Sequence, residues 1–109
     1  MGPTLMYYSY YLETSLDSNV FFTVDSLSSD LMDELIRSFS SSGGISQNVH
    51  FIDGYPNKKF IISKWNSAES YDIWLKNPLS QRYIQMRCSH NLENNITGML
   101  IGILPEPKL

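Results

Sequence analysis

The stretch Lys59–Leu75, KFIISKWNSAESYDIWL, constrains the fold of this chain most, because it joins a strand pattern to a helix pattern almost without a loop. Phe60–Ile62 is a run of aromatic and β-branched residues, and Trp65 closes it. Asn66 or Ser67 then offers a side-chain oxygen to the first backbone N–H groups of a helix. The stretch predicts a strand that leads directly into a helix.

The helix after this strand is expected to have one apolar face. Asn66 and Glu69 are three residues apart and fit a capping box at its start. Tyr71, Trp74 and Leu75 follow at the i, i+3 and i+4 spacing that places side chains on one side of a helix. This face predicts that the helix packs on the sheet to which the preceding strand belongs.

The N-terminal segment Thr4–Glu13 contains four tyrosines within five positions. Tyrosines at both odd and even positions indicate an extended segment, on a sheet edge or across a subunit interface. The first central strand is expected at Asn19–Asp25, NVFFTVD. The domain plan that follows treats residues 1–18 as an N-terminal extension and residues 19–109 as the folded domain.

The other elements follow from hydrophobic periodicity and turn residues. They are a helix over 29–41, an antiparallel hairpin of strands 45–53 and 59–65, helices on either side of Asn77-Pro78, and a strand over 96–104. The order is strand, helix, strand, strand, helix with a broken extension, strand. This order predicts a ferredoxin-like α+β fold with β-α-β-β-α-β connectivity.

The predicted sheet has helices on only one face. A chain of 109 residues has little apolar surface to spare, so its second sheet face needs a cover. A second copy of the chain would supply that cover, and we expect a homodimer.

Composition excludes several classes of partner and site. The net charge of −3 gives no basic surface for nucleic acid. Cys88 is the only cysteine, which excludes an internal disulfide and fits a reducing compartment. The sequence has no apolar run of about 20 residues and no signal-peptide pattern, so we expect a cytoplasmic protein without membrane contact. His50 and His90 have no carboxylate or cysteine at a ligand spacing, so no metal site is expected.

The segment Phe60–Met86, FIISKWNSAESYDIWLKNPLSQRYIQM, resembles the antibiotic-biosynthesis-monooxygenase-like family, which has the dimeric α/β-barrel fold. The resemblance rests on the strand ending in Trp65, the helix carrying Trp74-Leu75, the break and the further helix. Proteins with this fold include cofactor-free oxygenases, heme-degrading oxygenases and proteins of unassigned activity. The resemblance therefore implies a fold more strongly than a reaction.

The run IWLKN is most similar to the heme-degrading branch of that family. The resemblance to this branch implies an asparagine on the first core strand, a tryptophan on the following helix and a heme-ligating histidine on the next helix. Asn19 and Trp74 match the first two positions, whereas Ile84 stands at the histidine position and Tyr83 is beside it. No cofactor is therefore expected, and heme is kept as a third alternative.

The functional expectation is a monooxygenase-like enzyme acting on a small aromatic or polycyclic compound in an apolar pocket. Asn19, Trp74 and Tyr83 are expected to line that pocket, and Asn19 and Trp74 are the candidates for catalysis. Each of these residues also has an ordinary structural explanation. Large aromatic side chains on helices, such as Trp74 and Tyr83, are usually core residues, and an asparagine at the start of a strand, such as Asn19, is usually a turn residue. The alternative is a non-enzymatic dimer that binds a small molecule or a protein; heme binding or degradation comes third.

Overall fold

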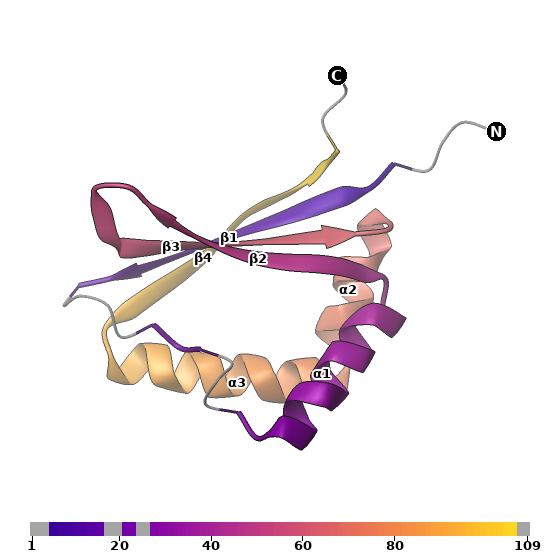
Figure 1. Cartoon of the computed structure of the whole chain (residues 1–109), viewed down its shortest axis with the longest axis horizontal. Helices are drawn as coiled ribbons and strands as arrows, with labels where there is room; N and C mark the ends of the chain where they lie inside the picture. Colours follow the sequence, from indigo (N-terminus) through magenta and orange to yellow (C-terminus); the bar gives the residue numbers. More distant parts are fainter. Residues whose placement is uncertain (1–4, 17–20, 24–26, 107–109) are drawn as a thin grey trace.

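The computed structural model describes residues 5–16, 21–23 and 27–106. Four antiparallel strands form one sheet in the order β2-β3-β1-β4, and the helices cover one of its faces (Figure 1). The elements in chain order are β1 (Tyr7–Ser15), α1 (Ser29–Ser41), β2 (Gly44–Ile52), β3 (Tyr55–Trp65), α2 (Ala68–Lys76), α3 (Pro78–Glu93) and β4 (Ile96–Pro105). The predicted ferredoxin-like α+β class is confirmed. Within the described ranges, no helix is long and apolar enough to cross a membrane.

The tyrosine-rich N-terminal strand is an inner strand, so its predicted place at the sheet edge is wrong. β1 pairs with β3 on one side, through Tyr7 opposite Trp65, and with β4 on the other. Its helix-facing positions include Ser9, Glu13 and Ser15, all buried. Because these residues are polar, the hydropathy pattern gave no sign that this face is enclosed.

The first strand of the fold is therefore β1, and not the expected strand at Asn19–Asp25. Residues 21–23 are outside any strand, and the rest of that predicted strand lies outside the described residues. β1 is an integral part of the sheet rather than an extension that precedes the domain.

Side-chain caps mark the starts of α1 and α3, whereas the cap predicted at the start of α2 differs. Ser28 Oγ accepts a hydrogen bond from Leu31 N at 3.3 Å at the start of α1, which begins at Ser29 as predicted. Asn77 ends α2, and its Oδ1 accepts from Leu79 N at 2.9 Å to start α3. The predicted capping box at the start of α2 does not form, because Asn66 Oδ1 accepts from the Ser70 hydroxyl instead, at 2.6 Å.

Gly43 connects the end of α1 to the junction between β3 and α2. Its backbone has φ +106°, and its carbonyl accepts a hydrogen bond from Asn66 N at 2.9 Å. A Cβ at this position would collide with the side chains of Ser70 and Asn66. Glycine is therefore required both for the left-handed backbone and for the close approach of α2.

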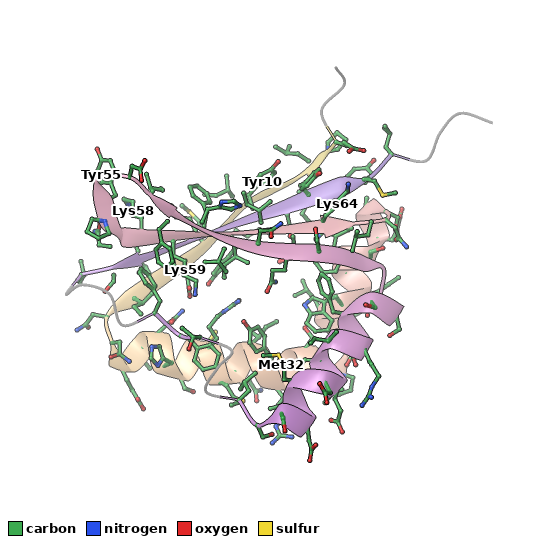
Figure 2. All side chains as sticks on the ribbon, viewed as in Figure 1. Tyr10, Met32, Tyr55, Lys58, Lys59 and Lys64 are labelled. Carbon is green, nitrogen blue, oxygen red and sulfur yellow. The ribbon has the colours of Figure 1, made fainter. Side chains whose placement is uncertain are left out.

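A buried polar cluster lies between β1, β3 and α3. Glu13 is 0% exposed; its Oε2 accepts from Asn91 Nδ2 at 2.7 Å, and its Oε1 lies 3.6 Å from Lys59 Nζ. Lys59 Nζ also donates to the carbonyl of Phe22 at 2.9 Å. Burial lowers the pKa of Lys59, and the neighbouring Glu13 carboxylate opposes that shift. Figure 2 shows Lys59 on the helix side of the sheet and Tyr10 on the opposite side.

We predict that Gly43→Ala destabilises the protein more than Gly54→Ala does. Both glycines have positive φ, but Gly54 has open space around the position of a Cβ. The left-handed conformation costs each alanine about 1–2 kcal/mol, and the collision with Ser70 and Asn66 adds about 1–3 kcal/mol at Gly43 only. Urea unfolding of both variants measures the difference, and equal losses would refute the contact at Gly43.

We also predict that Lys59→Met lowers the free energy of unfolding by about 3 kcal/mol, because it leaves a buried carboxylate without its counter-charge. The double variant Glu13→Gln/Lys59→Met should recover part of this loss, since an amide needs no counter-charge. Lys58→Met is the matched control. The Lys58 ammonium donates a hydrogen bond to Thr14 Oγ1 at 3.3 Å and lies outside the buried cluster. Equal destabilisation by Lys58→Met and Lys59→Met would contradict the prediction.

Candidate functional site

A cavity of about 340 Å³ lies between the sheet and all three helices. Strands β1 to β4 each supply part of its floor, and α1, α2 and α3 supply its walls. Its volume is at the lower end of the roughly 300–1,000 Å³ that is usual for small-molecule sites. A compact ligand of a few fused rings is the size of molecule that suits it.

One wall of the cavity is aromatic. The ring of Phe39 on α1 lies 5.0 Å from Trp65 and 5.7 Å from Trp74, and the ring of Tyr71 lies 5.6 Å from Trp65. The Phe39–Trp74 and Trp65–Tyr71 contacts are edge-to-face, a geometry that favours fixed ring orientations. The strand-to-helix junction predicted from Lys59–Leu75 thus brings both tryptophans to one end of the cavity.

The floor of the cavity carries hydrogen-bonded polar groups. Trp65, only 1% exposed, donates from Nε1 to Ser9 Oγ at 2.9 Å. Gln47 donates from Nε2 to Ser63 Oγ at 3.1 Å. Because Ser9 and Ser63 are opposite each other on β1 and β3, these bonds tie three neighbouring strands together beneath the cavity.

Arg87 on α3 is the one charged side chain among the described residues that line the cavity. Its guanidinium carbon lies 4.6 Å from the centre of the Tyr11 ring and 5.4 Å from that of Tyr83. Its Nε is buried and has no hydrogen-bond acceptor within the described part of the chain. The two rings hold the cation by cation–π attraction and leave its N–H groups available.

Two tyrosines at the cavity have perturbed acidities. Burial raises the pKa of Tyr11 and of Tyr71 above the ordinary 10.0, and the positive charge of Arg87 opposes both shifts. Both phenols are therefore neutral at physiological pH. A neutral phenol can donate its O–H to an oxygen of a ligand.

The structure brings together two of the three residues that the sequence placed in a pocket. Trp74 and Tyr83 line this cavity, and so does Ile84, at the position where the heme-degrading branch would place a histidine. Asn19 lies outside the described residues, so its role stays a prediction. His50 is exposed on β2, and the His90 ring packs 5.6 Å from that of Phe22.

Sequence reasoning missed Tyr11, Tyr71 and Arg87 as site residues. Arg87 follows Tyr83 by one helical turn, which is a signal that both point the same way. Tyr71 was assigned to the apolar face of its helix without a functional role. Tyr11 could not be placed, because its strand was expected at an edge.

The lining residues set the chemistry that this cavity can perform. Flat rings fit beside the aromatic wall, while the guanidinium of Arg87 and the phenols can stabilise negative charge on a ligand oxygen. Among the described lining residues there is no aspartate, glutamate, histidine or cysteine. Nor do three potential metal-ligating side chains of these types cluster anywhere in the described ranges.

No protein-family model matches the chain, and no curated protein matches its sequence. Solved structures do match it over nearly its full length. The cofactor-independent oxygenase SnoaB from Streptomyces nogalater is 10% identical, with a TM-score of 0.63 and coverage of 96% of both chains. A conserved protein of unknown function from Bacteroides thetaiotaomicron is 11% identical, with a TM-score of 0.56 and coverage of 95% of this chain and 100% of that one.

A structure described as an antibiotic biosynthesis monooxygenase is 11% identical, with a TM-score of 0.51 and coverage of 94% of this chain and 98% of that one. At such low identity the similarity establishes the architecture and leaves the reaction to be argued from the cavity. The chain has the fold of the antibiotic biosynthesis monooxygenases.

Proposed function

We propose that this protein is a monooxygenase-like enzyme that oxidises a small aromatic or polycyclic compound in the cavity between sheet and helices, without a bound cofactor. The observation that carries the proposal is the cavity itself, which combines an aromatic wall with several groups able to stabilise an oxyanion. The fold shared with SnoaB, described as a cofactor-independent oxygenase, supports the same class of reaction.

The proposed reaction uses electrons from the substrate to reduce dioxygen. Loss of a proton from an activated ring CH₂ group gives a carbanion whose charge is delocalised onto a ring oxygen. The carbanion transfers electrons to O₂, a C–O bond forms, and protonation gives a hydroperoxide. Cleavage of its O–O bond with loss of water leaves a ketone, so that CH₂ and O₂ become C=O and H₂O.

The cavity residues would act on the charged forms along this path. Arg87 and the neutral phenols of Tyr11 and Tyr71 would stabilise the delocalised anion by charge and by hydrogen bonds. Trp74 and Tyr83 would hold the ring system in place and keep water from it. Asn19 is retained as a candidate catalytic residue from the resemblance to the heme-degrading branch.

We further propose that the protein is a cytoplasmic homodimer in which two copies cover each other's open sheet face. The strand register places Tyr10 of β1, Ile62 of β3 and Gly102 of β4 in one row on the face away from the helices. Exposed Met99 and Leu104 of β4 extend this apolar surface toward the sheet edge. A packed partner would remove this surface from water.

A non-enzymatic dimer that binds a small molecule is the second candidate. It is favoured by one observation, namely that no described lining residue is an ordinary catalytic acid or base. Heme binding ranks below both, because Ile84 has no atom able to ligate iron and Tyr83 already packs against Arg87. Titration with hemin would reveal any heme site by a shift of the Soret band.

The decisive measurement for the proposed reaction is oxygen uptake with a panel of anthrones and hydroxylated naphthalenes. We predict uptake above the rate without protein, with one O₂ consumed for each ketone formed. Tyr71→Phe should lower kcat/KM roughly tenfold or more, because it removes from the cavity one of the phenols that are proposed to stabilise the anion.

Tyr55→Phe is the matched control for this variant, since Tyr55 is 56% exposed in the β2–β3 hairpin and outside the cavity. It should leave turnover unchanged. Binding of the panel compounds without oxygen uptake would reject the enzyme and favour the binding dimer.

For the proposed dimer we predict that light scattering after size-exclusion chromatography gives twice the mass of one chain. Ile62→Glu should shift the population to monomer, because it places a charge in the middle of the proposed interface. Ile73→Glu is the matched control, because Ile73 is exposed on α2, away from the open sheet face, and its substitution should preserve the dimer. A wild-type monomer at micromolar concentration would refute the proposal.

A further inference from the structure

We infer that the natural ligand of the cavity is an aromatic carboxylate, whose carboxylate group pairs with Arg87. This inference rests on the proposed function in one respect only, since both require that the cavity bind a ligand. It adds the charge of that ligand, which neither the fold nor the apolar wall specifies.

The first argument is that Arg87 lacks an acceptor. Its Nε is buried without a hydrogen-bond partner in the part of the chain that the structure describes. Within those residues, the two ion pairs join Lys59 to Glu13 and Lys64 to Glu106, so neither uses Arg87. A guanidinium whose buried Nε–H has no acceptor carries a desolvation cost that an anionic ligand would offset.

The second argument is the charge balance on the helix side of the sheet. Glu13 is the one buried carboxylate among the described residues, and Lys59 and Asn91 already occupy it, while the charge of Asp72 on α2 also acts on Tyr71. Lys59 is paired with the Glu13 carboxylate, whereas neither ion pair among the described residues includes Arg87. Of these two cations, the one without an ion-pair partner in the described residues is Arg87, which lines the cavity.

The third argument is that the positive charge of Arg87 acts on two tyrosines that line the cavity from different elements. Its charge lowers the pKa of Tyr11 on β1 and of Tyr71 on α2, against the larger effect of burial on each phenol. A negative group beside Arg87 would meet this charge in the cavity that the two neutral tyrosines also line. A neutral ligand would leave the positive charge uncompensated.

The geometry around Arg87 favours a carboxylate over a compact anion. The rings of Tyr11 and Tyr83 hold the guanidinium from two elements, β1 and α3, which limits its conformational freedom before a ligand arrives. A planar guanidinium presents paired N–H groups that match the two oxygens of a carboxylate. The aromatic wall formed by Phe39, Trp65 and Trp74 then suits the ring that bears this carboxylate.

The test compares 2-naphthoate with 2-naphthamide, which have the same ring system and nearly the same shape but differ in charge at neutral pH. Isothermal titration of the full chain with each compound should show that naphthoate binds about tenfold or more tightly. This comparison uses the wild-type protein and does not depend on the folding of any variant.

Arg87→Met should bring the two affinities to about the same value, mainly by weakening naphthoate binding. Arg82→Met is the matched control, because it removes the same charge from an exposed position on the same helix. The preference for naphthoate should persist in that variant. Loss of the preference in both variants would show that net charge, and not Arg87, produces it, and would overturn the inference.

The remaining outcomes separate this inference from the proposed function. Equal binding of both compounds to the wild type would overturn the inference and leave the cavity as a site for neutral aromatic ligands. Binding of neither compound at about 1 mM would overturn the inference and also count against the cavity as a ligand site. Oxygen uptake plays no part in the titration, so an inactive protein that prefers naphthoate would still support it.

Discussion

The position of the Trp65 indole is the interaction on which both the sheet and the cavity depend. Its ring fills the space where β3 ends and α2 begins, between Phe39 of α1 and Tyr71 of α2. Its N–H is satisfied by Ser9 of β1, so a large apolar ring is buried without an unpaired donor. One side chain thus fixes two helices and two strands relative to one another, and the aromatic wall of the cavity is built around it.

The sequence was sufficient to predict elements whose buried faces are apolar or whose ends carry cap residues. The Ser28 hydroxyl marks the start of α1, and Asn77-Pro78 marks the break between α2 and α3. β1 could not be placed, because its enclosed face carries Ser9 and Glu13, which hydropathy assigns to a surface. Its true position depends on a tertiary arrangement, the pairing of Glu13 with Lys59 and Asn91, which no local pattern contains.

The same limit explains which site residues could be predicted. The inward positions of Trp74 and Tyr83 can be predicted from hydrophobic periodicity, because large aromatic side chains at helical spacing are expected to face a core. The inward position of Arg87 cannot, since an arginine on a helix ordinarily points to solvent. Its spacing from Tyr83 indicates the same side of the helix, but the contacts with the rings of Tyr83 and of Tyr11, from the misplaced strand, establish its inward position. An error in the placement of β1 therefore hid the cation that gives the cavity its charge.

Two features on the helix side of the sheet, a cavity and a buried ion pair, reduce the contribution of apolar burial to stability. Much of the central space on this side is an open cavity, and the region beside Asn91 buries Glu13 and Lys59. Neither an open space nor a buried ion pair stabilises a fold as well as packed aliphatic side chains do. The sheet face that carries Tyr10 and Ile62 is a further apolar surface, on the side away from the helices. In the proposed dimer, a second copy on that face would add apolar burial without filling the cavity, so the proposed ligand binding and the proposed dimerisation would use opposite sides of one sheet.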